Sequence, residues 1–221
     1  MYIPRWFKED RVEVLQSEVN RLSFGTIITH GQSGLMASHV PMLIDPSNGN
    51  LGTLFGHLAR GNPQWRESSD EGLATFIGPD AYITPEWYAT KKLDGKTVPT
   101  WNYIEVQARG PITFFEDPRR LLKIVTRLTN HHESDSEKPW HVSDAPADYI
   151  RSELRSIVGF EMRVSKLDGK WKLSQNRTAE DREGVKLGLA KRNRPGDVQV
   201  SREMGARRSE AGSKPSSLKQ T

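Results

Sequence analysis

The sequence predicts a mainly β, α+β fold in which short antiparallel strands close into a small barrel. Six or seven short runs are rich in β-branched and aromatic residues, and Gly, Pro, Asn and Asp bound them. Helical patterns lie between some of these runs without alternating with them regularly, which disfavours a parallel sheet. Turn signals join several neighbouring runs, so those runs are expected to pair as antiparallel hairpins.

The first half of the chain begins with a predicted helix over residues 10–21. Val12, Leu15 and Val19 recur there at helical spacing, and Asp10 is a suitable N-cap. Three strands are then predicted over residues 24–30, 35–44 and 51–58, separated by turns at 31–34 and 45–50. A short helix over residues 62–69 follows, because Pro63 suits a first helical position.

The second half of the chain combines long strands with amphipathic helices. The pattern predicts a strand over 72–83 kinked at Gly78-Pro79, a flexible basic loop at 91–96, and a long strand over 101–115. Helices are expected at 117–130, 147–156 and 178–191, the last capped by Thr178. Between them, the run 167–169 (Leu-Asp-Gly) predicts a hairpin turn joining strands 158–164 and 170–174.

The domain organisation follows from where apolar periodicity stops. Residues 1–192 are expected to form one domain, and residues 193–221 a disordered basic tail without periodic apolar positions. The net charge of +4 comes from this end of the chain. Residues from 191 onward carry eight Lys or Arg against three Asp or Glu, whereas residues 1–190 carry 24 against 25. The predicted domain is therefore nearly neutral overall.

Composition also excludes several classes of chemistry. The chain has no cysteine, which rules out disulfides, thiolate metal sites and a cysteine nucleophile, and is consistent with a reducing compartment. No run approaches the roughly 20 apolar residues of a membrane span. We therefore expect a soluble, cytoplasmic protein.

Six segments together resemble one family, the PaiB-like FMN-binding negative transcriptional regulators. The segments occur in order over roughly residues 1–190. They are YIPRWF (2–7), SHVP (38–41), GHLARGNPQW (56–65), GPDAYI (78–83), VPTWNY (98–103) and KLSQNR (172–177). The resemblance implies a flavin-reductase-like, FMN-binding split β-barrel with peripheral helices, a homodimer with FMN near the subunit interface, and a role in repressing genes.

The first group of candidate cofactor residues lies in the segments at 38–41 and 56–65. FMN needs cations or helix N–H groups around its phosphate and polar groups around its ring. Arg60 could grip the phosphate in a bidentate manner, although it could also be an ordinary loop cation. This group consists of Ser38, His39, Val40, His57, Arg60, Asn62 and Gln64.

The second group of candidates lies in the segments at 98–103 and 172–177. Trp101 is by default a core aromatic residue, and a stacking or interface role is the functional interpretation. The polar run before the last helix is unusual for a purely structural strand end, and the resemblance assigns it to the flavin pocket. This group consists of Thr100, Trp101, Asn102, Gln175, Asn176 and Arg177.

No catalytic residue or metal site is predicted. His131 and His132 are adjacent on a helix, so their side chains point about 100° apart and converge poorly on a metal ion.

Two further functions remain open beside the FMN-binding regulator. An FMN-dependent oxidoreductase of small molecules is the alternative, since the flavin itself carries the redox chemistry. Direct DNA contact through the basic tail or the 91–96 loop is the other, because those segments concentrate the cations.

Overall fold

The computed structural model describes residues 1–68 and 70–206, and the chain forms two compact units. Of the described residues, unit 1 contains Met1–Glu9, Ile77–Glu105 and 169–206, and unit 2 contains Asp10–Phe76 and Val106–Asp168. The expected single domain over residues 1–192 is thus divided between two units. Three strands, β5 (Glu71–Ile83), β6 (Thr100–Phe115) and β8 (Lys166–Lys172), contribute residues to both.

The strands form one hydrogen-bonded sheet that is mainly antiparallel. Its order is β1-β8-β6-β5-β2-β3-β4-β7. A further pairing between β6 and β7 joins the strands from β6 to β7 into a closed ring, and β8 and β1 extend from β6. Every register that the structure describes is antiparallel, as in Thr26↔His39 and Leu54↔Met162. The remaining strands are β1 (Lys8–Glu9), β2 (Phe24–Gly31), β3 (Gly34–Asp45), β4 (Thr53–Ala59) and β7 (Ile157–Arg163).

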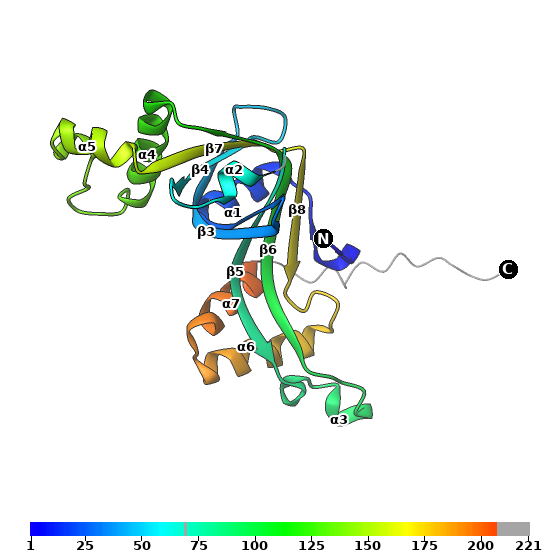
Figure 1. The fold of residues 1–221 in the computed structure, drawn as a ribbon. Coiled ribbons are helices and arrows are strands. Elements are labelled where there is room, and N and C mark those ends of the chain that lie inside the picture. The colour runs from blue at the N-terminus through cyan, green and yellow to red at the C-terminus, as the bar shows by residue number, and fades with distance from the viewer. Residues whose placement is uncertain (69, 207–221) are drawn as a thin grey trace. The chain divides into compact units, whose positions relative to one another are not determined.

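The helices of unit 2 cover its strands (Figure 1). The longest, α4, begins at an Asp117 cap that accepts from Arg120 N at 2.8 Å, and it buries Ile124 and Leu128 against Leu43 and Phe55. Each fully buried Leu, Ile or Phe contributes about 1.5 to 3 kcal/mol relative to an exposed one, so this contact anchors α4. The helices of this unit are α1 (Val12–Leu22), α2 (Gln64–Glu67), α4 (Pro118–His132), η3 (Val142–Asp144) and α5 (Ala147–Leu154).

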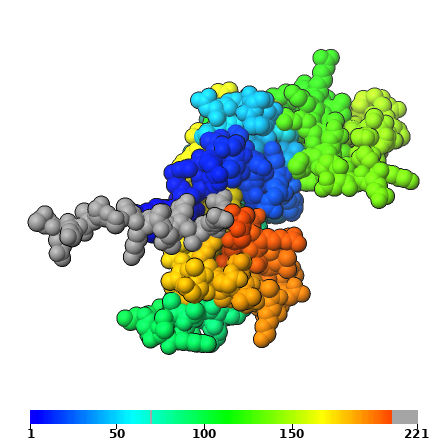
Figure 2. Space-filling model, turned by 180° about the vertical axis from the view of Figure 1, so that it is seen from behind, coloured from blue at the N-terminus to red at the C-terminus, as the bar shows by residue number. Residues whose placement is uncertain are grey.

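In unit 1, helices α6 (Ala179–Arg192) and α7 (Pro195–Ala206) pack together, as Figure 2 shows in yellow to red. A glycine is required where α6 meets the short helix η2 (Pro85–Trp87). A Cβ on Gly188 would lie 2.2 Å from the Trp87 ring, and one on Gly184 would lie 2.0 Å from the Trp87 carbonyl oxygen. The remaining helices of this unit are η1 (Arg5–Phe7) and α3 (Lys91–Asp94), the latter within the expected basic loop.

Two expectations about the C-terminal third differ from the structure. The predicted hairpin of residues 158–174 does not form, because β7 pairs with β4 and β6 whereas β8 pairs with β1 and β6, and residues 167–169 lie inside β8. The expected disorder from residue 193 is replaced over residues 195–206 by α7, which buries Val200 and Met204. Residues 207–221 lie outside the described part. β5 also runs through Gly78-Pro79 without interruption.

Within the described residues, no helix combines the length and the apolar character needed to cross a membrane.

Candidate functional site

Three of the predicted cofactor residues meet in unit 2 through their side chains. Asn62 Nδ2 donates to Ser38 Oγ at 2.8 Å, and Ser38 Oγ donates to Gln64 Oε1 at 2.6 Å. Gln64 is only 1% exposed, and its Nε2 lies within 3.3 Å of Ile27 O, Thr29 Oγ1 and Met36 O. These side chains satisfy one another, so the cluster fixes the segment after β4 to β3.

Arg60 lies at the end of β4 and is already engaged by groups of its own unit. Its guanidinium donates to the carbonyl oxygens of Arg155 and Ile157 and forms an ion pair with Glu116. These bonds join the end of β4 to the α5–β7 connection. An anion at Arg60 would have to displace the Glu116 carboxylate. Nothing in the sequence indicated this ion pair.

The two histidines of unit 2 have different environments. His39 is exposed on β3, with its Nδ1 2.8 Å from Thr26 Oγ1 and its ring edge-on to Phe24 at 4.3 Å, and Val40 follows it half-buried opposite Gly25. His57 lies on β4, and its Nδ1 is buried without a hydrogen-bond partner among the described residues. Burial lowers the pKa of His57, because the charged imidazolium is the form that desolvation disfavours.

A cavity of about 280 Å³ lies beside His57. The side chains around it are partly apolar and partly polar, and they belong to Pro41, Val125, Leu128, Thr129, His132, Glu133 and Trp140. An orphaned ring nitrogen in such surroundings can accept or donate one hydrogen bond to a ligand.

In unit 1, the Asn102 side chain is buried, whereas those of its neighbours Trp101 and Tyr103 on β6 are exposed or half-buried. It is fully buried, its Nδ2 donates to Ser174 Oγ at 3.0 Å, and the same nitrogen lies 3.5 Å from Met204 Sδ. Successive strand residues point to opposite sides, so Trp101 and Tyr103 face the other way. Trp101 is accordingly 52% exposed.

The predicted segment 175–177 forms a tight turn after β8. Ser174 has a φ of 62°, in the left-handed region, and the buried Gln175 accepts from Leu173 N at 2.7 Å and donates to Trp171 O at 2.5 Å. Asn176 is exposed. The Arg177 guanidinium lies 4.6 Å from the centre of the Tyr88 ring.

Two lysines that the sequence analysis did not select lie on the exposed side of this part of the sheet. In β8 the order Lys170-Trp171-Lys172 alternates, with Trp171 only 3% exposed and both lysines on the opposite side. Lys170 Nζ lies 5.2 Å from the Tyr103 ring centre, and Lys172 Nζ donates to Thr100 Oγ1 and to Trp101 O.

These residues define a surface that we call the lysine-aromatic face. The Tyr82 ring contacts the Trp101 ring at a centroid distance of 5.9 Å and an angle of 72°, and both residues are exposed. Because the Trp101 carbonyl oxygen accepts from Lys172, this aromatic pair adjoins the lysines. The face consists of Tyr82, Trp101, Tyr103, Lys170 and Lys172.

The charge at this face is not compensated within the described residues. Lys170 and Lys172 on this face, and Arg177 close enough to repel Lys172, form no ion pair with a described acidic side chain. The pKa of Lys172 is lowered by burial and then by repulsion from Lys170 and Arg177. Uncompensated cations beside exposed aromatic rings suit a ligand with a phosphate and a flat ring system. FMN has both parts, so the donor set fits this cofactor.

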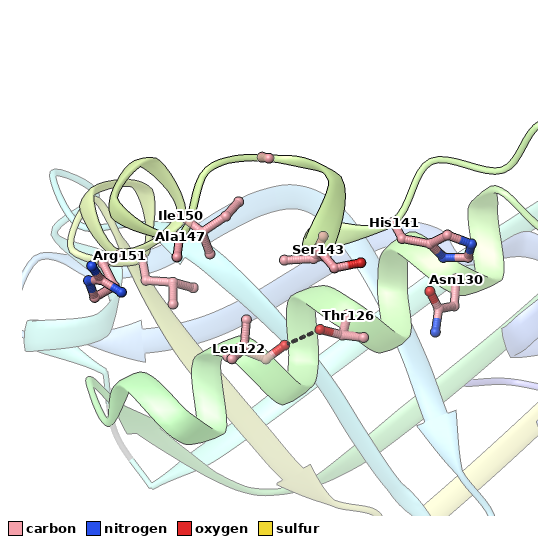
Figure 3. A pocket seen from close by; sticks show the side chains of 11 residues that line it. Leu122, Thr126, Asn130, His141, Ser143, Ala147, Ile150 and Arg151 are labelled. Carbon is pink, nitrogen blue, oxygen red and sulfur yellow. Dashed lines mark hydrogen bonds between the residues drawn. The ribbon is translucent and has the colours of Figure 1, made fainter.

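A separate cavity of about 650 Å³ lies elsewhere in unit 2 (Figure 3). It is lined by α4, η3 and α5, and none of the predicted cofactor residues contributes to it.

Comparison with known proteins gives the following matches. The family profile described as "Putative FMN-binding domain" matches residues 1–166. The chain is 34% identical over 203 residues to "Protease synthase and sporulation protein PAI 2" of Bacillus subtilis, which covers 91% of this chain and 95% of that protein. It is 35% identical to an uncharacterized protein of Aspergillus fumigatus, covering 86% and 91% of the two chains.

Two solved structures share the fold at low sequence identity. The FAD and heme binding protein from Mycobacterium smegmatis has a TM-score of 0.55 and 12% identity, covering 75% of this chain and 73% of that one. The flavocytochrome Anf3 from Azotobacter vinelandii also has a TM-score of 0.55, with 9% identity and coverages of 77% and 72%. The chain therefore has the mainly antiparallel, split-barrel-like fold of these two proteins, with peripheral helices.

Proposed function

The chain belongs to the FMN-binding domain family and FMN is its cofactor, and from that premise we propose that it is a homodimeric, cytoplasmic negative transcriptional regulator. What supports the regulatory role is the similarity to protease synthase and sporulation protein PAI 2 of Bacillus subtilis along 91% of the chain, together with the segments that resemble the PaiB-like regulators. A bound flavin supplies reversible electron transfer, which could make regulation depend on redox state.

The observation that carries the cofactor site is the uncompensated positive charge at the lysine-aromatic face. Lys172 and Arg177 would hold the phosphate, and the exposed Trp101 ring would contact the flavin ring. Thr100 Oγ1 already accepts from Lys172 Nζ, so it would position that ammonium group. The buried Asn102 and Gln175 would support this face from behind rather than touch the cofactor.

We propose that the predicted cofactor residues of unit 2 mainly shape and support β3 and β4 rather than bind the phosphate. Exposed His39 and half-buried Ser38 and Val40 present β3 to solvent, while His57 offers one free ring nitrogen. Asn62 and Gln64 would hold β3 in place. Arg60 is the weaker phosphate ligand, because Glu116 occupies its guanidinium.

DNA contact is the remaining part of the regulatory proposal. At the 91–96 loop, α3 lies beyond the ends of β5 and β6 in Figure 1, and Lys92 and Lys96 are exposed there. Lys91 is paired with Glu86, which leaves fewer cations for DNA phosphates than the sequence suggests.

Purification followed by spectroscopy tests this function. The full chain should show flavin absorbance, and heat should release a chromophore with the mass of FMN. Retarded migration of promoter DNA without NAD(P)H oxidation supports the regulator, whereas turnover of NAD(P)H without DNA binding supports the alternative, an FMN-dependent oxidoreductase. A protein that neither carries nor takes up FMN contradicts the cofactor assignment.

A further inference from the structure

The cavity of about 650 Å³ between α4, η3 and α5 is independent of the residues assigned to FMN. Its volume lies within the roughly 300 to 1,000 Å³ of small-molecule sites. One wall is a stripe of α4 at helical spacing, formed by Leu122, Thr126 and Asn130. This stripe lies away from the buried side of α4, so the cavity is not a packing defect of the core.

The cavity has an apolar middle and a polar end. Figure 3 shows Asn130 and His141 together at one end and Arg151 at the other. The rest of the wall holds the hydroxyl residues Thr126 and Ser143 and is otherwise apolar, with Leu122, Val142, Ala145, Ala147, Ile150 and Leu154.

Side chains on this side of the cavity have hydrogen-bonding groups that a ligand could use. The Asn130 amide and the Ser143 hydroxyl have no hydrogen-bond partner among the described residues. The backbone N–H of Asp144 donates to the His141 carbonyl oxygen at 2.9 Å, while the Asp144 carboxylate accepts from His141 N at 2.8 Å, so neither bond uses the His141 ring. An imidazole ring carries at least one N–H in every protonation state, so the His141 ring can donate to a ligand.

The side chains that line the cavity carry little unpaired charge, which disfavours an ionic ligand. Among the lining residues, the permanently charged side chain is that of Arg151, and it forms an ion pair with Asp148. A phosphate or carboxylate would therefore find no unpaired lysine or arginine among the lining residues.

We propose that this cavity binds a small uncharged molecule with an apolar body and a carbonyl oxygen at one end. The apolar body lies against Leu122, Ile150 and Leu154. The carbonyl oxygen accepts from the Asn130 amide and from the His141 ring.

Binding of the neutral dye 6-propionyl-2-dimethylaminonaphthalene tests the site, because the dye joins a naphthalene body to a carbonyl group. Equilibrium dialysis against the full chain should show saturable binding of one dye per chain. Ala147→Trp places a large ring in the cavity and should weaken binding about tenfold or more. Ala179→Trp is the matched control, since Ala147 and Ala179 are both exposed first residues of helices, and it should bind like the wild type.

The carbonyl contact is tested with 2-dimethylaminonaphthalene, which lacks the acyl group. The wild type should bind the acyl dye several-fold more tightly, and Asn130→Leu, an exposed position, should reduce that preference, because a hydrogen bond contributes about 1 kcal/mol. Circular dichroism establishes that each variant is folded. Absence of saturable binding, equal affinities of Ala147→Trp and Ala179→Trp, or an unchanged preference in Asn130→Leu would each overturn the proposal.

Discussion

Lys172 combines two properties that a phosphate ligand requires. It is positioned by Thr100 Oγ1 and the Trp101 carbonyl oxygen, so its ammonium group is held in place before any ligand arrives. Burial lowers the pKa of Lys172, and repulsion from the nearby Lys170 and Arg177 lowers it further. An anion would relieve the repulsion, which is why we assign the phosphate to this residue.

His57 gives the protein a stability that depends on pH. Because burial lowers its pKa in the folded state, the unfolded chain takes up the proton first as pH falls through the usual value near 6.5. Stability is therefore present above that pH and declines below it, by at most about 1.4 kcal/mol per pH unit for one proton. Denaturant titrations between pH 7 and pH 5 should show a smaller decline for His57→Gln than for the wild type.

The control for this measurement is His30→Gln, because His30 is exposed at the end of β2. It should follow the wild-type pH dependence. If His57→Gln and His30→Gln behave alike, then His57 is not the group that makes the fold sensitive to acid.

The residues predicted for the second part of the site differ in how accessible the structure leaves their side chains. Thr100, Trp101 and Arg177 lie at or beside the lysine-aromatic face as solvent-accessible or half-buried groups. Asn102 and Gln175 have the right chemical type, but long-range folding directs their side chains to Ser174 and Trp171. The alternation of lysines around Trp171 was the signal that could have identified Lys172.

At the scale of elements, helices and strands with strong local patterns were predictable, and those that depend on tertiary contacts were not. The amphipathic pattern of residues 117–130 predicts a helix, and the structure has α4 over Pro118–His132. α7 has little apolar periodicity, and it is held by α6 through the Arg192–Asp197 pair and by Met204 beside Asn102. The hairpin signal at 167–169 failed because β8 pairs with β1 and β6 instead.

The packing of α7 makes a direct prediction. Val200 is fully buried, whereas Val198 on the same helix is 38% exposed. Val200→Ala should lower the free energy of unfolding by about 2 kcal/mol, because two methyl groups leave the core and a cavity remains. Val198→Ala should change it by less than about 0.5 kcal/mol. Urea denaturation of both variants measures this difference, and equal small effects would mean that α7 does not pack as described.

At the scale of the whole molecule, the sequence predicted the fold class but not the division into two units. Local patterns specify strands, whereas the division depends on contacts between residues that are far apart along the chain, such as Thr90 with Asp181. The matched family and the related folds agree with the antiparallel, flavin-binding prediction.

The proposed homodimer is a property of the whole molecule and can be linked to the cofactor. If FMN binds only to the dimer, added FMN must favour association, and dilution must release FMN. Sedimentation velocity over a range of protein concentrations, with FMN or with riboflavin, should show stronger association with FMN because riboflavin lacks the phosphate. A monomer that retains stoichiometric FMN at every concentration would contradict this linkage.

The most direct test of the central claim is a titration of FMN into flavin-free wild type, Lys172→Gln and Lys186→Gln. Lys186 lies on α6 and is paired with Glu183, so its variant controls for the loss of one positive charge in the same unit. The wild type and Lys186→Gln should bind one FMN per chain with equal affinity. Lys172→Gln should bind it about 10- to 100-fold more weakly, the range for a lost hydrogen bond to a charged group. Equal affinity of all three proteins would contradict the assignment of the phosphate to the lysine-aromatic face.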